Sequence, residues 1–197
     1  IGNLYKKLGD NEEAFNFLKE AKSKFRTLSS KNTKKFTPSY LNALAEESSL
    51  HLENNEIAAA ELLMEEYFRM IDISDKSYPA YQAFAREIFA RIFIELNKLT
   101  EAKEQIKIAK DLLELLPDNY YLHPLLDLSQ SKIQELNGNL KYALKFNLRA
   151  LNSIEESKKN LNYKLDSFSK LEPEVERMYA HYFSLIHRSY KETSSEN

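Results

Sequence analysis

Glu47 and His51 stand four residues apart, so a helix would place this carboxylate and this imidazole one turn apart on the same face. Glutamate and histidine at such spacing can coordinate a metal ion. A metal site needs further ligands, and the sequence contains no second Glu/His pair of this kind. We therefore predict that Glu47 and His51 pack between helices or face solvent, and we expect no metal or other cofactor.

The residues that serve nucleophilic or phosphate chemistry are not arranged in the motifs that those reactions need. Serines are plentiful, yet no Gly-x-Ser-x-Gly sequence occurs, and the three glycines are isolated rather than grouped in a phosphate-binding loop. Paired acids are better explained by solvated helix faces than by acid–base catalysis; they are Glu12–Glu13, Glu46–Glu47, Glu65–Glu66 and Glu155–Glu156. The sequence therefore predicts a protein that is not an enzyme.

Charge and hydropathy exclude two classes of partner. The 197 residues carry a formal charge of −2, with lysine and arginine dispersed among the acids, so we expect no direct contact with nucleic acid. No apolar run reaches the ~18 residues that cross a bilayer, so we expect no membrane insertion. The chain begins at Ile1 rather than methionine, and we expect it to be a fragment of a longer protein.

Four of the five prolines are regularly spaced. Each of these four precedes a long helix-compatible run, at intervals of 41, 45 and 49 residues: Pro38, Pro79, Pro124 and Pro173. Proline suits the first turn of a helix, because its missing N–H would have no partner there. The predicted helices are residues 1–8, 11–29, 38–53, 56–72, 79–97, 100–116, 122–137, 140–158 and 173–192. We expect loops at 29–37 and 159–172.

A second pattern lies inside these units. Four residues that tolerate a left-handed backbone are each followed five residues later by alanine: Gly9, Asn54, Asn97 and Gly138, followed by Ala14, Ala59, Ala102 and Ala143. The glycine or asparagine would end one helix, and the small alanine would let the next helix pack closely against it. The pattern predicts antiparallel helical hairpins.

The opening segment resembles the tetratricopeptide repeat (TPR) family in its first-helix glycine and tyrosine, its Gly-Asp turn and its second-helix alanines: Gly2, Tyr5, Gly9, Asp10, Ala14 and Ala21. The segments 96–102 and 136–143 look like the same turn and second helix. The resemblance implies an all-α, right-handed solenoid of about four stacked antiparallel hairpins plus a terminal helix. Units of 41–45 residues exceed the family's standard length of about 34, and its tryptophan is absent.

This resemblance also implies a domain plan and a binding face. One repeat domain, 1–197, would comprise units at about 1–37, 38–78, 79–121, 122–172 and a partial 173–197. In the family, first helices line a concave face that receives a peptide or a partner helix. Its residues here would be Asn3, Lys6, Ser48, Glu87, Arg91, Glu95 and Lys132. Ordinary ion pairs on a solvated helix face also explain Glu87, Arg91 and Glu95.

Two functions from different classes follow. The first is a scaffold that binds a peptide or helix of another protein. The alternative is the sensory or regulatory region of a larger, bacterial-type signalling or transcription-regulating protein. Apolar residues crowd the last predicted helix: Tyr179, Tyr182, Phe183, Leu185 and Ile186. A further helix of the chain could cover part of this set, or the last helix could form a homodimer.

Overall fold

The structure is a computed structural model that describes residues 2–31, 33–71, 78–116, 122–159 and 172–195. Within these segments every regular element is a helix, so the predicted all-α class is confirmed. The helices are α1 (Gly2–Lys7), α2 (Asn11–Lys31), α3 (Thr33–Glu53), α4 (Ile57–Arg69), α5 (Pro79–Glu95), α6 (Leu99–Leu113), α7 (Leu122–Leu136), α8 (Leu140–Lys159) and α10 (Glu172–Ser195). None of these helices is long and apolar enough to cross a membrane.

Most helix bounds agree with the predicted ranges to within a few residues, but the loop predicted at 29–37 is wrong. α2 continues to Lys31 and α3 begins at Thr33, so helix covers nearly all of that stretch. Pro38 lies inside α3 rather than at its start. The stretch 29–37 contains no glycine that would end a helix. A proline near the start of a helix removes only one backbone hydrogen bond, the one from its own position to a carbonyl of the first turn. The loop predicted at 159–172 falls on residues 160–171, which lie outside the described segments.

The same short turn joins the two helices of each pair α1–α2, α3–α4, α5–α6 and α7–α8. A residue with positive φ ends the first helix of each pair: Gly9 (76°), Asn55 (62°), Asn97 (56°) and Gly138 (75°). The next amide donates to a carbonyl five residues back, as Glu56 does to His51 at 2.8 Å. The carbonyl of Glu56 then accepts the first hydrogen bond of α4, from Ala60 at 3.1 Å. One residue therefore ends a helix and starts the next, which folds the pair back on itself.

The second pair corrects the predicted pattern by one residue. Its left-handed residue is Asn55 rather than Asn54, and its fully buried alanine is Ala60 rather than Ala59. Asn54 still donates its amide to Leu50, so it belongs to the last turn of α3. With this correction, the left-handed residue precedes the buried alanine by five residues in all four pairs.

A small residue on the first helix of each pair lies twelve positions before that alanine. These four crossing residues are all buried: Gly2, Ser48, Ala90 and Ser131. Ser48 Oγ donates to the Ala60 carbonyl at 2.9 Å, and Ser131 Oγ donates to the Ala143 carbonyl at 2.7 Å. A Cβ added at Gly2 would come within 2.9 Å of the Leu18 side chain. The crossing accepts only small side chains, because the second helix lies directly against the first.

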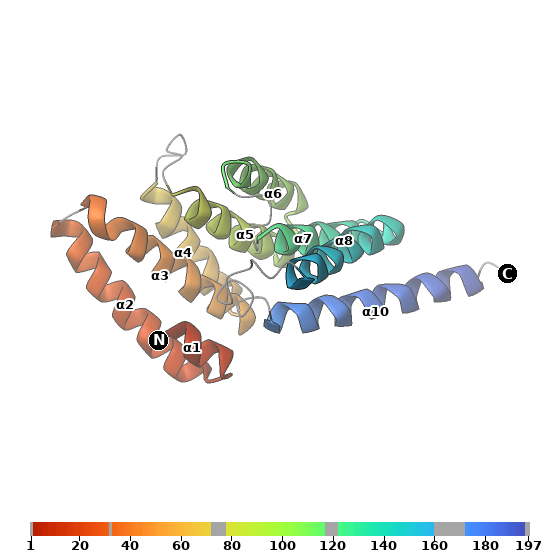
Figure 1. The fold of residues 1–197 in the computed structure, drawn as a ribbon, viewed down its shortest axis with the longest axis horizontal. Coiled ribbons are helices and arrows are strands. Elements are labelled where there is room, and N and C mark those ends of the chain that lie inside the picture. Colours follow the sequence, from red (N-terminus) through yellow and green to blue (C-terminus); the bar gives the residue numbers. More distant parts are fainter. Residues whose placement is uncertain (1, 32, 72–77, 117–121, 160–171, 196–197) are drawn as a thin grey trace.

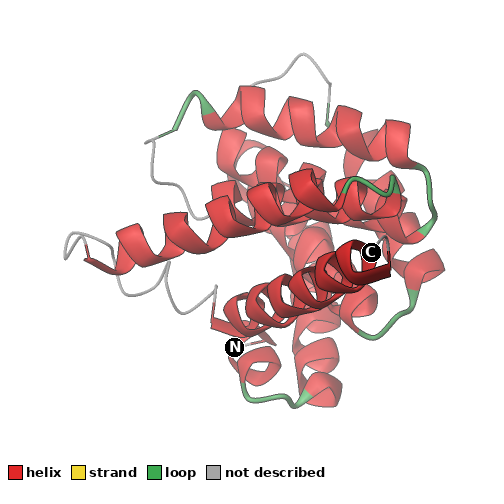
Figure 2. Cartoon of the chain, turned by 90° about the vertical axis from the view of Figure 1, so that its right-hand side faces the viewer, coloured by secondary structure: helices red, strands yellow, loops and turns green. Residues whose placement is uncertain are grey.

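The pairs lie side by side from α1 and α2 at one end of the molecule to α10 at the other (Figure 1). The first helices are neighbours, since α3 packs against α5 and α5 against α7. The second helix of one pair also contacts the next pair, since α4 packs against α5 and α6 against α7. α10 packs against α8. Figure 2, with the α10 side toward the viewer, shows the described segments as helices joined by loops.

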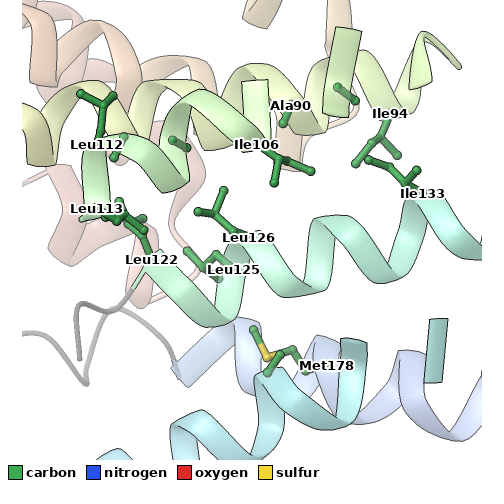
Figure 3. Packing of buried hydrophobic residues seen from close by; sticks show 14 of the residues in the cluster. Ala90, Ile94, Ile106, Leu112, Leu113, Leu122, Leu125, Leu126, Ile133 and Met178 are labelled. Carbon is green, nitrogen blue, oxygen red and sulfur yellow. The ribbon is translucent and has the colours of Figure 1, made fainter. Parts of the chain in front are cut away.

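One apolar core crosses the boundaries between pairs. Figure 3 shows Ala90 of α5, Ile106 of α6 and Leu126 of α7 directed toward one another, with Met178 of α10 below them. Phe84 packs against this cluster and also against the cluster that joins α3, α4 and α5. A single hairpin cannot bury its apolar face alone, so stacking stabilises every pair through its neighbours.

Replacing Gly138 tests the left-handed turn. An added Cβ would meet no atom within 4 Å, so any loss of stability would come from the φ of 75° alone. That conformation costs an L-residue about 1–2 kcal/mol, and asparagine tolerates it better than alanine does. We expect Gly138→Ala to lower the free energy of unfolding by about 1 kcal/mol and Gly138→Asn by clearly less, as measured by urea denaturation. Equal losses for the two variants would contradict this account.

Candidate interaction groove

A concavity of about 610 Å³ opens between the C-terminal end of α3 and the helices α5, α7 and α10. A second concavity of about 630 Å³ adjoins it and shares Ile94, Glu95, Lys132 and Glu135 with the first. The second one reaches the turn at Asn97. We call the two together the groove. Apart from Asn97 in the turn after α5, first helices and α10 supply all of its described walls.

The groove residues occupy equivalent positions on successive helices. Arg91 of α5 corresponds to Lys132 of α7, 41 residues later, and to Ser184 of α10, a further 52 residues later; all three line the groove. Glu87, Leu128 and Ala180 are related by the same two offsets and also line it. Ala90 and Ser131 differ by 41 as well, so on α5 and α7 the crossing residue is followed directly by a groove residue. The packing of these two hairpins therefore sets which of their side chains reach the groove.

The structure brings four of the seven predicted site residues together. Glu87, Arg91, Glu95 and Lys132 all line the groove. Ser48 does not, because it is a crossing residue that donates its hydroxyl to α4. Leu52 and Glu53 line the groove from α3 instead. Asn3 and Lys6 lie on α1, and their side chains are outside the described part of the structure.

The charges of the groove are sorted between its walls. Acidic side chains predominate on α3 and α5, with Arg91 among them: Glu53, Glu87 and Glu95. Basic side chains predominate on α7 and α10, with Glu135 among them: Lys132, Arg177 and Arg188. The same lining includes apolar side chains from α3, α5 and α7: Leu52, Ile94, Leu125 and Leu128. This arrangement can receive a chain that carries both signs of charge and at least one apolar side chain.

On α5, the ordinary ion pairing expected among Glu87, Arg91 and Glu95 is found between Arg91 and Glu87. Arg91 Nη1 lies 3.9 Å from Glu87 Oε2, and the Glu87 side chain is nearly fully buried. That separation is longer than a hydrogen bond, so the two charges attract without a fixed geometry. Glu95 is exposed at the end of the same row. Glu95 and Lys132 are therefore the groove charges best placed to meet a ligand from solvent.

A buried histidine links α10 to the rest of the groove. His181 Nε2 lies 2.8 Å from Glu135 Oε2 on α7, and its Nδ1 lies 2.8 Å from the Asn147 amide on α8. Arg188 also donates to Glu135. The neutral ring with its hydrogen on Nε2 satisfies both contacts, since Asn147 Nδ2 then donates to Nδ1. Burial lowers the pKa of His181 below its usual 6.5, Glu135 raises it, and the positive charges of Lys132 and Arg188 lower it.

His181, Glu135 and Arg177 are groove residues that were not predicted. The spacing of Arg177, His181 and Ser184 repeats that of Leu125, Ser129 and Lys132 on α7, so the repeat register was the available signal. The sequence did not reveal this correspondence, because equivalent residues of α7 and α10 are 52 positions apart, whereas those of α5 and α7 are 41 positions apart. The irregular interval spans residues 160–171.

Glu47 and His51 are placed for packing. Lys22 Nζ of α2 lies 2.7 Å from Glu47 Oε2, and His51 Nε2 lies 4.0 Å from the other carboxylate oxygen. His51 Nδ1 contacts Glu56 at the start of the next helix, across the α3–α4 turn. Within the described segments, no group of three or more His, Asp or Glu side chains is arranged to hold a metal ion.

Comparison with known proteins adds no relative: the sequence matches no protein-family model, no curated protein and no solved structure.

The His181 contacts predict a pH-dependent loss of stability. Because the native pKa of His181 lies below 6.5 while the unfolded chain titrates near 6.5, the unfolded state binds more protons as the pH falls through this range. We expect the free energy of unfolding to fall between about pH 7.5 and about pH 5.5. His181→Gln, which stays neutral, should show a smaller fall than the parent over the same range in urea denaturation. Identical pH profiles would exclude this role of His181.

Proposed function

We propose that the chain is a TPR-like helical repeat module whose groove binds a segment of another protein. The repeated turn, the buried alanine and the small crossing residue are features that stacked helical hairpins require. They recur in four pairs, at Gly9, Asn55, Asn97 and Gly138. The right-handed solenoid of the resembled family is the arrangement that this repetition favours.

The observation that carries the proposal is the shared register of the groove residues. Arg91, Lys132 and Ser184 come from three different helices and converge on one concavity. A row of side chains that advances from helix to helix matches the extended form of a peptide, whose side chains also advance at regular intervals. Each of the two concavities, at about 610 Å³ and about 630 Å³, lies within the range of about 300–1,000 Å³ that ligand pockets measure.

The sorted charges define the chemistry of the ligand. A basic residue of the ligand would face Glu95 on α5, and an acidic residue would face Lys132 on α7. An apolar side chain between them would reach Ile94 and Leu128. Charges at a groove rim mainly select the partner and its orientation, while apolar contacts supply more of the affinity. The proposed ligand is therefore a short protein segment with an apolar residue between residues of opposite charge.

Selection of peptides from a random display library, followed by charge reversal, tests this function. We expect Lys132→Glu to weaken binding of the selected peptides about tenfold, a loss of about 1.4 kcal/mol. Lys103→Glu is the matched control, because Lys103 is exposed on α6 and is not among the groove residues. Fluorescence polarisation with a labelled peptide gives the affinities, and the control should stay within about twofold of the parent.

A compensating change in the peptide separates a direct contact from a general loss of structure. Replacing the acidic residue of the selected peptide by lysine should restore its binding to the Lys132→Glu variant and weaken its binding to the parent. Peptides that bind both proteins equally, or a library that yields no binder, would count against the groove as a peptide site.

A further inference from the structure

α10 presents three different faces. One face packs on α8, where Leu185 contacts Leu140 and Ala143. A second face lines the groove through Arg177, His181 and Ser184. The third carries large apolar side chains that are substantially exposed: Tyr179 (39%), Phe183 (63%), Ile186 (41%) and Tyr190 (71%). They follow one another at intervals of four, three and four residues, so they form one stripe along the helix. We call this set the outer stripe.

The register identifies what the outer stripe corresponds to in the other first helices. With the offset of 52 that relates the groove residues, Tyr179 corresponds to Asp127 and Phe183 to Ser131 on α7. Asp127 accepts from Arg149 of α8, and Ser131 donates to Ala143 of α8. On α5, the residue equivalent to Asp127 is Arg86, which donates to Gln105 of α6. This side of α5 and α7 therefore packs against the second helix of the same hairpin.

Phe183 is much larger than the residues at the equivalent crossing positions of the other first helices. The equivalent crossing residues are glycine, serine or alanine, and they admit a second helix only because they are small. A phenylalanine there would hold a helix further away than α8 lies from α7. The outer stripe thus fits a helix that packs through large side chains on both surfaces, as helices in coiled coils do.

The stripe is self-complementary when two copies run antiparallel. Its 4-3-4 spacing reads the same in both directions, so Tyr179 of one copy would face Tyr190 of the other, and Phe183 would face Ile186. Glu176 and Lys191, both exposed beside the stripe, would then lie next to each other across the interface. In a parallel pair Glu176 and Lys191 would lie fifteen helical positions apart along the axis, so this contact between opposite charges would be lost. The charges therefore select the antiparallel arrangement.

We propose that the outer stripe of α10 binds the outer stripe of a second copy of this chain, antiparallel. Each aromatic residue can bury about 150–250 Å², so two copies would bury on the order of 1,000 Å² in all, near the lower limit for specific interfaces. The dimer is accordingly weak and reversible. The groove face of α10 points elsewhere, so each copy keeps its groove open, and the dimer would present two grooves.

Sedimentation velocity over a range of concentrations tests the dimer. We expect the apparent mass to rise from 23.0 kDa toward twice that value as the concentration increases. Phe183→Glu should keep the mass at the monomer value. Leu62→Glu is the matched control, because Leu62 is equally exposed (64%) on α4 and should leave the dimer intact. Circular dichroism should show the same helix content in all three proteins, since both replaced side chains face solvent.

Cysteine pairing tests the antiparallel register. The chain contains no cysteine, so introduced thiols react without background. Mixing Tyr179→Cys protein with Tyr190→Cys protein under mild oxidation should give a disulfide-linked heterodimer. Tyr190→Cys alone should give little, because the two positions would be eleven helical residues, about 16 Å, apart along the axis, beyond the span of a disulfide. A parent that stays monomeric at all concentrations, or a Phe183→Glu variant that dimerises like the parent, would overturn the proposal.

Discussion

The fit of a small residue against the start of a neighbouring helix is the constraint on which the rest of this structure depends. At each crossing the second helix begins two residues after a left-handed residue, and the alanine five residues after that left-handed residue is fully buried. Ser131 Oγ reaches the Ala143 carbonyl directly, which is possible only when two helices lie unusually close. Such a crossing fixes the rotation of both helices about their axes. Once that rotation is fixed on α5 and α7, the residue after the crossing faces the groove, so hairpin packing and groove composition are set together there.

Polar residues within the helix interfaces add specificity to this packing. Asp127 accepts two hydrogen bonds from Arg149 and lies 3.6 Å from Lys110 Nζ, so it connects α7 to both α8 and α6. Arg86 is buried against the ring of Phe68 and donates to Gln105 at 2.7 Å. Burying such groups costs free energy unless their partners are in place. A helix that slipped by one residue would lose these partners, whereas purely apolar contacts would tolerate the slip better.

The sequence predicted the features that depend on short-range chemistry. Gly9, Asn97 and Gly138 were identified as turn residues because few residue types adopt positive φ, and the alanines were identified by their fixed distance from these turns. The sequence did not predict features for which two adjacent residues are equally suited, or which depend on a contact with another helix. Asn54 and Asn55 are chemically equivalent, and only the bond from Asn54 N–H to Leu50 places the first of them in the helix. Ser48 looked like an exposed polar residue, because nothing in the sequence reveals that its hydroxyl bonds to the Ala60 carbonyl. α3 begins at Thr33, five residues before Pro38, although the spacing of the prolines predicts Pro38 in the first turn of this helix.

α10 packs on α8 with one face, lines the groove with a second, and carries exposed apolar side chains on a third. It is attached through Met178 and Leu185 and through the hydrogen bonds of His181 to Asn147 and Glu135. Because it also forms one wall of the groove, a ligand that contacts Arg177 or Ser184 would stabilise its attachment to α8. Contacts on its outer stripe would stabilise the same helix from the opposite side. Two ligands that both require α10 to be ordered are coupled thermodynamically even when they never touch. The first ligand to bind supplies the free energy that orders α10, so the second binds more tightly. Groove binding and self-association would then reinforce each other.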